Sequence, residues 1–218
     1  MNDAPARSPA RNRSMGQRQH NRAAMRNVIV DAAEKVFSSK PFSKVSMRDI
    51  AKEAGISPAL IYRHFPDQQH LFVEAFLRGT THLLDQFAGH IAKNRKPRLE
   101  EAADLFIAYL TENEQYFKMM THFMLEGTVH EGLLDTLDAI ERSMLDRFDV
   151  LFRKAGAKED VRLVSHCFFA ALNGILITFR RHPGRSDEEV DRHMHRIGHI
   201  MARMFLLAIN STNEDVFS

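Results

Sequence analysis

The segment SMRDIAKEAGISPALIYRHF (46–65) constrains the fold more than any other part of the chain. Gly55, Ser57 and Pro58 lie close together between two short runs of helical apolar spacing, although 218 residues contain only 10 Gly and 7 Pro. Gly55 suits a left-handed residue just past a helix end. Ser57 followed by Pro58 is typical of a helix N-cap with proline at the first helical position. We therefore expect one short helix to end at Gly55 and another to begin directly after Ser57.

The flanking patterns complete a three-helix unit. Residues 46–49 have the form of a capping box with Ser46 as the N-cap, which predicts a second helix over 46–54 and a third over 58–65. An amphipathic stripe predicts a first helix over about 22–38. A sharp turn with Gly between two short helices is the pattern of a helix-turn-helix. The expected core of this unit consists of Ile29, Ala33, Phe37, Ile50, Ile61 and Phe65.

Helical periodicity continues to the end of the chain, without alternating strand patterns. Asp67 would cap a fourth helix over 67–91, and KNRKPR (93–98) would form an exposed loop. Further helices are expected over 99–112, 114–126, 131–154, 159–181 and 187–209. The predicted fold class is all-α, with an N-terminal three-helix helix-turn-helix domain and a larger C-terminal helical domain. The predicted divisions are a flexible basic arm (1–20), the helix-turn-helix domain (21–66), a connecting helix (67–91) and the helical domain (92–218).

Charge is distributed unevenly along the chain. Residues 1–65 contain 12 Lys and Arg against 5 Asp and Glu, a net charge of +7, whereas residues 66–218 contain 18 against 23, a net charge of −5. Such asymmetry is expected when one part of a protein meets phosphates. The alternative is an arginine-rich tail that only adds solubility.

Several classes of protein are disfavoured by the sequence. The single cysteine, Cys167, excludes an internal disulfide framework and fits a reducing cytoplasm. No apolar run is expected to reach the ~18 residues that span a bilayer, and the N-terminus lacks the apolar segment of a signal peptide. Common catalytic and dinucleotide-binding motifs are missing, so neither an enzyme nor a cofactor is predicted. His195 and His199 could begin a metal site, but a solvated histidine face is favoured because no partners are identifiable, and no metal is predicted.

Residues 28–72, VIVDAAEKVFSSKPFSKVSMRDIAKEAGISPALIYRHFPDQQHLF, resemble the DNA-binding domain of the tetracycline-repressor (TetR) family. The landmarks include the Ser-capped D-I-A…A-G and the S-P-x-x-x-Y-x-H-F that follows it. Two positions depart from the family pattern. Pro41 stands where the family usually has glycine, and Gln68 stands where it usually has lysine, so Gln68 can offer a phosphate only a neutral hydrogen bond.

The resemblance implies a DNA-binding surface centred on the third helix. Small residues at its start would allow approach to base edges in the major groove, and Arg63 would read guanine or hold a phosphate. By resemblance, Tyr62 and His64 hydrogen-bond phosphates and Ser46 presents its helix N-terminus to one; alternatively, Tyr62 and His64 only pack around the core. The candidate residues are Lys44, Ser46, Arg48, Ser57, Pro58, Ala59, Tyr62, Arg63, His64 and Gln68.

Two nearly continuous apolar stretches, 166–179 and 197–209, predict helices that are buried on more than one side. A four-helix interface between two copies would bury them, as the resemblance also implies; the alternative is that both belong to the core of one chain. The candidate interface residues are Ala170, Ala171, Gly174, Ile197, Ile200, Met201 and Met204.

The middle helices are rich in Met and aromatic side chains, which favours an adaptable apolar ligand pocket, with ordinary core as the alternative. The candidate pocket residues are Phe106, Tyr109, Tyr116, Met120, Phe123, Met124, Phe152, His166, Phe169 and Asn173.

Together these patterns predict a cytoplasmic, ligand-responsive transcriptional regulator. It would bind a palindromic double-stranded operator as a homodimer and be released by a small apolar or aromatic effector. Repression is the commoner role in the family, and activation is the alternative. The rivals are an enzyme, a metal sensor, and a ligand carrier with an inactive DNA-binding unit.

Overall fold

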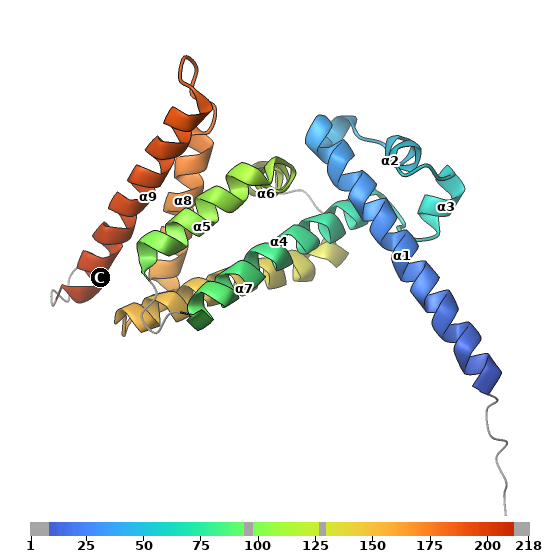
Figure 1. Ribbon diagram of the computed structural model, residues 1–218, viewed down its shortest axis with the longest axis horizontal. Coiled ribbons are helices and arrows are strands. Elements are labelled where there is room, and N and C mark those ends of the chain that lie inside the picture. Colours follow the sequence, from blue (N-terminus) through green and yellow to red (C-terminus); the bar gives the residue numbers. More distant parts are fainter. Residues whose placement is uncertain (1–8, 94–97, 127–129, 212–218) are drawn as a thin grey trace, which may run out of the picture. The chain divides into compact units, whose positions relative to one another are not determined.

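The computed structural model describes residues 9–93, 98–126 and 130–211, and over these ranges it contains helices and their connections without strands (Figure 1). The all-α fold class is therefore confirmed. The chain divides into two compact units, Met1–Ala75 and Phe76–Ser218. The elements are α1 (Pro9–Ser39), the 3-10 turn η1 (Phe42–Lys44), α2 (Met47–Glu53), α3 (Pro58–Tyr62), α4 (Gln68–Lys93), α5 (Leu99–Glu112), α6 (Glu114–Glu126), α7 (Glu131–Ala155), α8 (Val161–Phe179) and α9 (Asp187–Asn210).

The expected core of the first unit is confirmed by burial. Each of its six predicted members has at most a few per cent of its surface exposed: Ile29, Ala33, Phe37, Ile50, Ile61 and Phe65. The start of α4 adds Phe72, whose ring lies 4.8 Å from the rings of both Phe37 and Phe42. Helices α2 and α3 are held by this shared apolar core, since helices this short are unstable alone.

The turn between α2 and α3 has the backbone that its sequence predicts. Gly55 lies in the left-handed region with φ of 67°, and the N–H of Ile56 donates to the carbonyl of Ala51 at 3.0 Å. The hydroxyl of Ser57 accepts from the N–H of Leu60 at 3.3 Å. At the start of α2, the capping box between Ser46 and Asp49 is present in both directions.

The first helix is longer than predicted. Helix α1 begins at Pro9, so residues 9–20, expected in a flexible arm, are helical, and residues 1–8 of that arm lie outside the described residues. The physical reason is that extending a formed helix adds one hydrogen bond per residue, whereas only nucleation is unfavourable. This segment also contains good helix formers such as Arg, Ala, Met and Gln.

Helix α3 ends at Tyr62, earlier than the predicted residue 65. The amide of Phe65 still donates to the carbonyl of Ile61 at 3.0 Å. Pro41 begins the unpredicted 3-10 turn η1 with φ of −55°. Because proline already favours this φ, the loop after α1 needs no left-handed residue at the position where the family usually has glycine.

Arg26 ties α1 to the segment after α3. Its guanidinium donates to both carboxylate oxygens of Glu74 on α4, at 2.9 and 2.8 Å, and to the carbonyl of His64 at 3.0 Å. The same group lies 4.2 Å from the centre of the Phe65 ring. A planar guanidinium can make all these contacts at once, and the Glu74 carboxylate raises the pKa of Arg26.

In the second unit, α5 packs against α9, and α8 packs against both α7 and α9. Phenylalanine rings fill the space between these helices. Phe148 lies at the centre, with ring distances of 5.3 Å to Phe87, 6.2 Å to Phe106 and 5.5 Å to Phe168. Phe152 lies 5.4 Å from Phe168. These rings form the main apolar core of the unit.

Arg180, at the C-terminal end of α8, connects that helix to the end of α5. Its guanidinium donates to the carbonyls of Leu110 and Thr111 and lies 4.5 Å from the centre of the Phe117 ring. It thereby satisfies carbonyl groups that have no partner within α5.

Among the described residues, α8 is by length and composition apolar enough to cross a membrane, and 44% of its most apolar 18-residue stretch is buried. The expectation that no run reaches this length is therefore wrong for α8. The few polar residues of α8 do not lower its mean hydropathy below that of a membrane-spanning helix. Its packing against α7 and α9 explains why a helix of a folded helical unit is so apolar.

We expect the capping box of α2 to make the protein sensitive to acid. Hydrogen bonds from Ser46, and then from Lys40, lower the pKa of Asp49 from 3.8 to about 2. The stabilisation by this carboxylate is complete above pH 3.8 and is lost as the pH falls towards 2. Asp49→Asn should therefore unfold with a shallower pH dependence between pH 5 and pH 2 in chemical denaturation.

Ser46→Ala is the matched variant, because it removes the largest cause of the shift while keeping the carboxylate. It should also show a shallower dependence. If both variants keep the acid dependence of the natural sequence, the capping box does not contribute to it.

Candidate functional sites

Helix α3 presents one buried face and one exposed face. Ile61 is fully buried, whereas Tyr62 is 54% exposed. Pro58, Ala59 and Arg63 are also exposed, and so are Lys44, Ser46, Arg48 and Ser57. The interpretation that Tyr62 only packs around the core does not fit this exposure. The surface combines a small-residue helix start, a phenol and a guanidinium, which suits contacts with phosphates and base edges.

His64 and Gln68 have more specific surroundings. His64 is half-buried, its Nδ1 atom lacks a hydrogen-bond partner among the described residues, and its pKa is lowered by burial and then by Arg22, Arg26 and Arg63. The side-chain amide of Gln68 donates a hydrogen bond to the carbonyl of Phe42 at 2.9 Å, and this bond connects α4 to η1.

Arg22 belongs to this surface and was missed at the sequence level. It is exposed on α1 and lies near enough to His64 to lower its pKa. Helical spacing from Arg26 could have indicated it, since residues four apart share a helix face.

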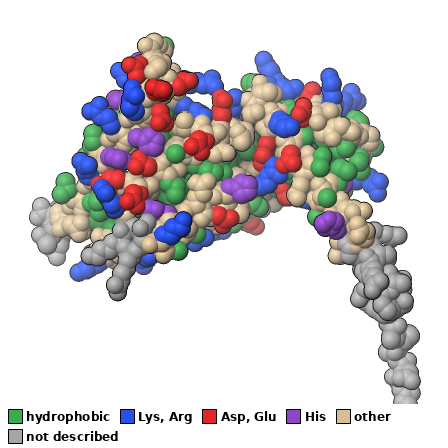
Figure 2. Space-filling model, in the orientation of Figure 1, with side chains coloured by type: hydrophobic (Ala, Val, Ile, Leu, Met, Phe, Trp, Pro, Cys, Tyr) green, Lys and Arg blue, Asp and Glu red, His purple; other side chains and the backbone are tan. Residues whose placement is uncertain are grey.

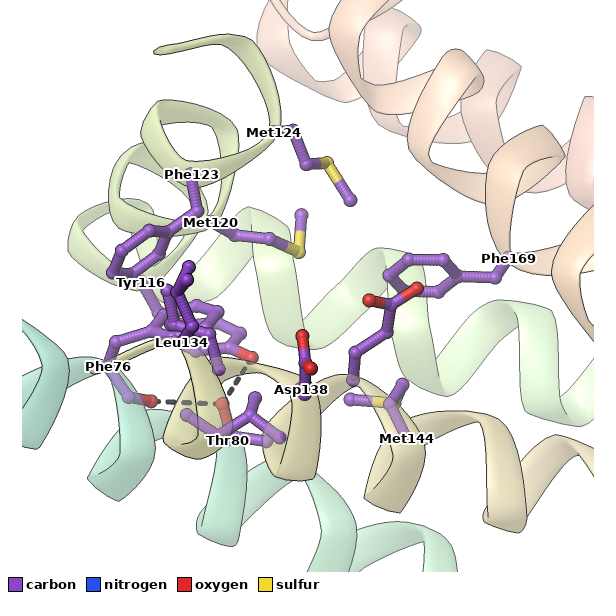
Figure 3. A pocket seen from close by; sticks show the side chains of 13 residues that line it. Phe76, Thr80, Tyr116, Met120, Phe123, Met124, Leu134, Asp138, Met144 and Phe169 are labelled. Carbon is purple, nitrogen blue, oxygen red and sulfur yellow. Dashed lines mark hydrogen bonds between the residues drawn. The ribbon is translucent and has the colours of Figure 1, made fainter. Parts of the chain in front are cut away.

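The second unit contains a cavity of about 300 Å³ between α4, α6, α7 and α8 (Figure 3). Most of its lining is aromatic, aliphatic or thioether. It is lined by Phe76, Thr80, Tyr116, Met120, Phe123, Met124, Leu134, Leu137, Asp138, Ile140, Glu141, Met144 and Phe169.

One hydrogen-bonded chain crosses the wall of this cavity. The hydroxyl of Thr80 donates to the carbonyl of Phe76 at 3.0 Å and lies 2.9 Å from the hydroxyl of Tyr116. Burial raises the pKa of Tyr116, so this phenol stays neutral at physiological pH.

The ten predicted pocket residues separate into two groups. Those that line the cavity are Tyr116, Met120, Phe123, Met124 and Phe169. The others do not line it: Phe106 and Phe152 are fully buried core residues, Tyr109 donates to the carbonyl of Gly79 at 2.7 Å, and Asn173 donates to the carbonyl of Phe169 at 2.8 Å. His166 is exposed on α8. Composition predicts adaptable apolar helices, but it does not indicate which apolar face meets a void.

The α7 residues that line the cavity were missed at the sequence level, where Phe152 was the candidate from this helix. Leu134, Leu137, Asp138, Glu141 and Met144 occupy one face of this helix. Their helical spacing is visible in the sequence, but the same spacing also describes a solvated face next to a core stripe.

Helices α8 and α9 expose an apolar surface in the single chain. Ala170 and Gly174 are exposed on α8, and Ile200 and Met204 are 53% and 55% exposed on α9. The other predicted interface residues, Ala171, Ile197 and Met201, are half-buried. Leu163, Cys167, Ile177 and Leu207 extend the exposed surface. We call this surface the α8–α9 face. Exposed apolar side chains on two helices that pack together suit an interaction site.

His195 and His199 do not form the solvated face favoured above. Both are half-buried and contact Asp104 of α5, His195 through Nδ1 at 2.5 Å and His199 through Nε2 at 2.8 Å. In the part of the chain that is described, no group of three or more His, Cys, Asp and Glu could hold a metal ion. Figure 2 shows histidine and acidic side chains together over α5 and α9. The cluster therefore joins these two helices by hydrogen bonds between the Asp104 carboxylate and the two imidazole rings.

Comparison with known proteins agrees with this geometry. Residues 29–75 match the profile of the family described as "Bacterial regulatory proteins, tetR family". An uncharacterised HTH-type transcriptional regulator from Haemophilus influenzae is 46% identical over 50 residues, which cover 22% of this chain and 24% of that protein. The match thus spans about a quarter of the length of that relative. Within the matched segment, both proteins have a helix-turn-helix sequence.

Solved structures extend the similarity of fold beyond this domain. The fatty acid degradation regulator FadR from Bacillus halodurans has a TM-score of 0.67 at 16% identity, covering 82% of this chain and 94% of its own. SmeT, the repressor of the Stenotrophomonas maltophilia multidrug efflux pump SmeDEF, has a TM-score of 0.62 at 22% identity, covering 87% and 96%. Residues 29–75 thus match the DNA-binding domain of the tetR family of bacterial regulatory proteins, and most of the chain shares the fold of these solved regulators.

Gly79 of α4 has a packing role that can be tested. A Cβ atom at this position would lie 2.4 Å from Cδ2 of Tyr116, so Gly79→Ala must displace the ring that lines the cavity. We expect a loss of stability of about 1–3 kcal/mol and an altered near-ultraviolet circular dichroism signal, since the chain contains no Trp and only 3 Tyr.

The control is Gly89→Ala in the same helix, where a Cβ atom would meet nothing within 4 Å. It should be neutral or stabilising by up to about 1 kcal/mol through helix propensity. Equal effects of the two substitutions would contradict the packing role of Gly79.

Proposed function

We propose that this protein is a ligand-responsive transcriptional repressor that works in the cytoplasm. It binds a palindromic DNA operator as a homodimer and is released by a small apolar or aromatic effector. The observation that carries the proposal is the division of α3: Ile61 anchors the helix in the core while Tyr62 and Arg63 face outward. SmeT is a repressor by its description, which favours repression over activation.

On DNA, α3 enters the major groove with its small N-terminal residues towards the base edges. Arg63 reads guanine or holds a phosphate, while Tyr62, His64 and Arg22 contact the backbone of the duplex. Arg26 supports this surface from behind, because its bonds to Glu74 and His64 restrain the segment after α3. Neutralised phosphates release counterions, so operator affinity falls steeply with salt.

Arg63→Ala should weaken binding to a duplex from the protein's own upstream region by about 1–3 kcal/mol. Fluorescence anisotropy at several salt concentrations measures both affinity and salt slope. If Arg63 holds a phosphate, the slope should also fall by about one; if it reads guanine, discrimination at one base pair should relax. Lys158→Ala, an exposed cation in the second unit, is the control and should bind normally. Normal binding by Arg63→Ala would remove this residue from the interface, and a chain that ignores duplex DNA would overturn the function.

Dimerisation uses the α8–α9 face. Two helices from each copy form a four-helix interface, which buries the exposed apolar side chains and pairs two α3 helices for a two-fold operator. Gly174 supports this assignment, since a Cβ atom there would meet nothing within 4 Å in the single chain. The absence of a side chain at an exposed helical position suits close approach of a second helix.

Gly174→Arg should give a folded monomer with weak operator binding, because the single chain has room for a side chain whereas the interface does not. Gly132→Arg, at another exposed position with nothing within 4 Å, is the matched control and should remain dimeric. Sedimentation measures the association state, and circular dichroism verifies the fold of each variant. A dimeric Gly174→Arg protein would place the interface elsewhere.

Effector binding is coupled to DNA through α4. This helix contributes Phe72 to the core of the first unit and both Phe76 and Thr80 to the cavity. A ligand that prefers one position of α4 shifts the separation of the two α3 helices in the dimer. A coupling of about 1–3 kcal/mol lowers operator affinity about 5–150-fold.

A further inference from the structure

The polar groups of the cavity share one property: they accept hydrogen bonds. Asp138 and Glu141 are its charged lining residues, and both are acidic. They are three residues apart on α7 and therefore occupy one face of that helix. Neither forms an ion pair or hydrogen bond with another residue in the described ranges. Figure 3 shows the Asp138 carboxylate directed towards the space between Met120 and Phe169.

The hydroxyl groups add another acceptor. Thr80 has a single hydroxyl hydrogen, which it donates to the carbonyl of Phe76. The 2.9 Å contact with Tyr116 therefore requires the phenol to be the donor. With its hydrogen used, the Tyr116 oxygen retains only acceptor capacity towards a ligand.

The remaining lining suits the body of an organic cation. The rings of Phe76, Tyr116, Phe123 and Phe169 present faces and edges, and a cation within about 6 Å of an aromatic face is attracted to it. Met120, Met124 and Met144 have flexible thioethers that adapt to irregular apolar shapes. No lining residue is Lys, Arg or His, so the cavity lacks a cation to pair with a ligand carboxylate.

We propose that the effector is an amphipathic organic cation, with N–H donors on an aromatic or alkyl body. Its apolar body occupies the Phe and Met lining, while its ammonium group lies towards Asp138 and Glu141 and can donate to Tyr116. Anions of similar shape are rejected by the two carboxylates. The release of DNA by this cation rests on the proposed function, whereas the binding of the cation to the cavity does not.

The test compares three probes with one naphthalene body at pH 7: 1-naphthylmethylamine, 1-naphthylmethanol and 1-naphthoate. Calorimetry with the full chain should give the ammonium about tenfold higher affinity than the alcohol. The reason is that two partly solvated carboxylates and the aromatic faces attract its charge. The carboxylate should bind at least about tenfold more weakly than the alcohol, since like charges repel.

The double variant Asp138→Asn and Glu141→Gln keeps the shape of the cavity and removes its charge. It should reduce the preference for the ammonium over the alcohol to about twofold, while binding of the alcohol is unchanged. Glu131→Gln, an exposed residue of α7 outside the cavity lining, is the control and should retain the full preference. Thermal unfolding verifies that both proteins are folded.

The outcomes separate this inference from the proposed function. Stronger binding of the alcohol or the carboxylate, no binding of the ammonium, or a preference that survives the double variant would overturn the cation assignment. Charge-dependent binding of the ammonium without any change in operator affinity would support the assignment and contradict the coupling through α4. Release of DNA by the neutral or anionic probe alone would support the coupling through α4 and contradict the cation assignment.

Discussion

The first unit depends on a shared apolar core, because neither α2 nor α3 is long enough to be stable by itself. Ile50 and Ile61 must be buried in this core for either helix to persist. The same requirement leaves the opposite side of α3 exposed, where Tyr62 and Arg63 lie. Arg26 adds a polar restraint to this apolar one by joining Glu74, His64 and Phe65. The proposed DNA-binding surface is thus the solvent side of a core that the short helices require.

Helix α4 is subject to two packing demands along its length. Its beginning contributes Phe72 to one core, and its middle contributes Phe76 and Thr80 to the cavity wall. Gly79 allows the Tyr116 ring to pack directly against this helix. The proposed coupling runs through this helix, since a change in one packing arrangement alters what the other must accommodate.

Local sequence signals predicted the local structure well. Gly55, Ser57 and Asp67 act where their chemistry indicates, and Asp67 accepts from the N–H of His70 at 2.9 Å. The failures involve longer distances. Phe106 has the same composition signal as Phe123, but Phe106 contacts Phe148 whereas Phe123 lines the cavity. His195 and His199 looked unpartnered because Asp104 is about ninety positions away in the chain.

The sequence by itself determined the all-α class, the helix-turn-helix and, apart from the start of α1, the helix boundaries within a few residues. These follow from capping, turn chemistry and apolar spacing, which act between neighbours along the chain. Only the tertiary structure decided which Met and aromatic side chains surround a void, that Asp138 and Glu141 stand beside it, and that Asp104 joins two histidines. Those facts depend on how helices distant in sequence meet. The apolar periodicity of a helix specifies that a face must be covered, but it does not specify by what.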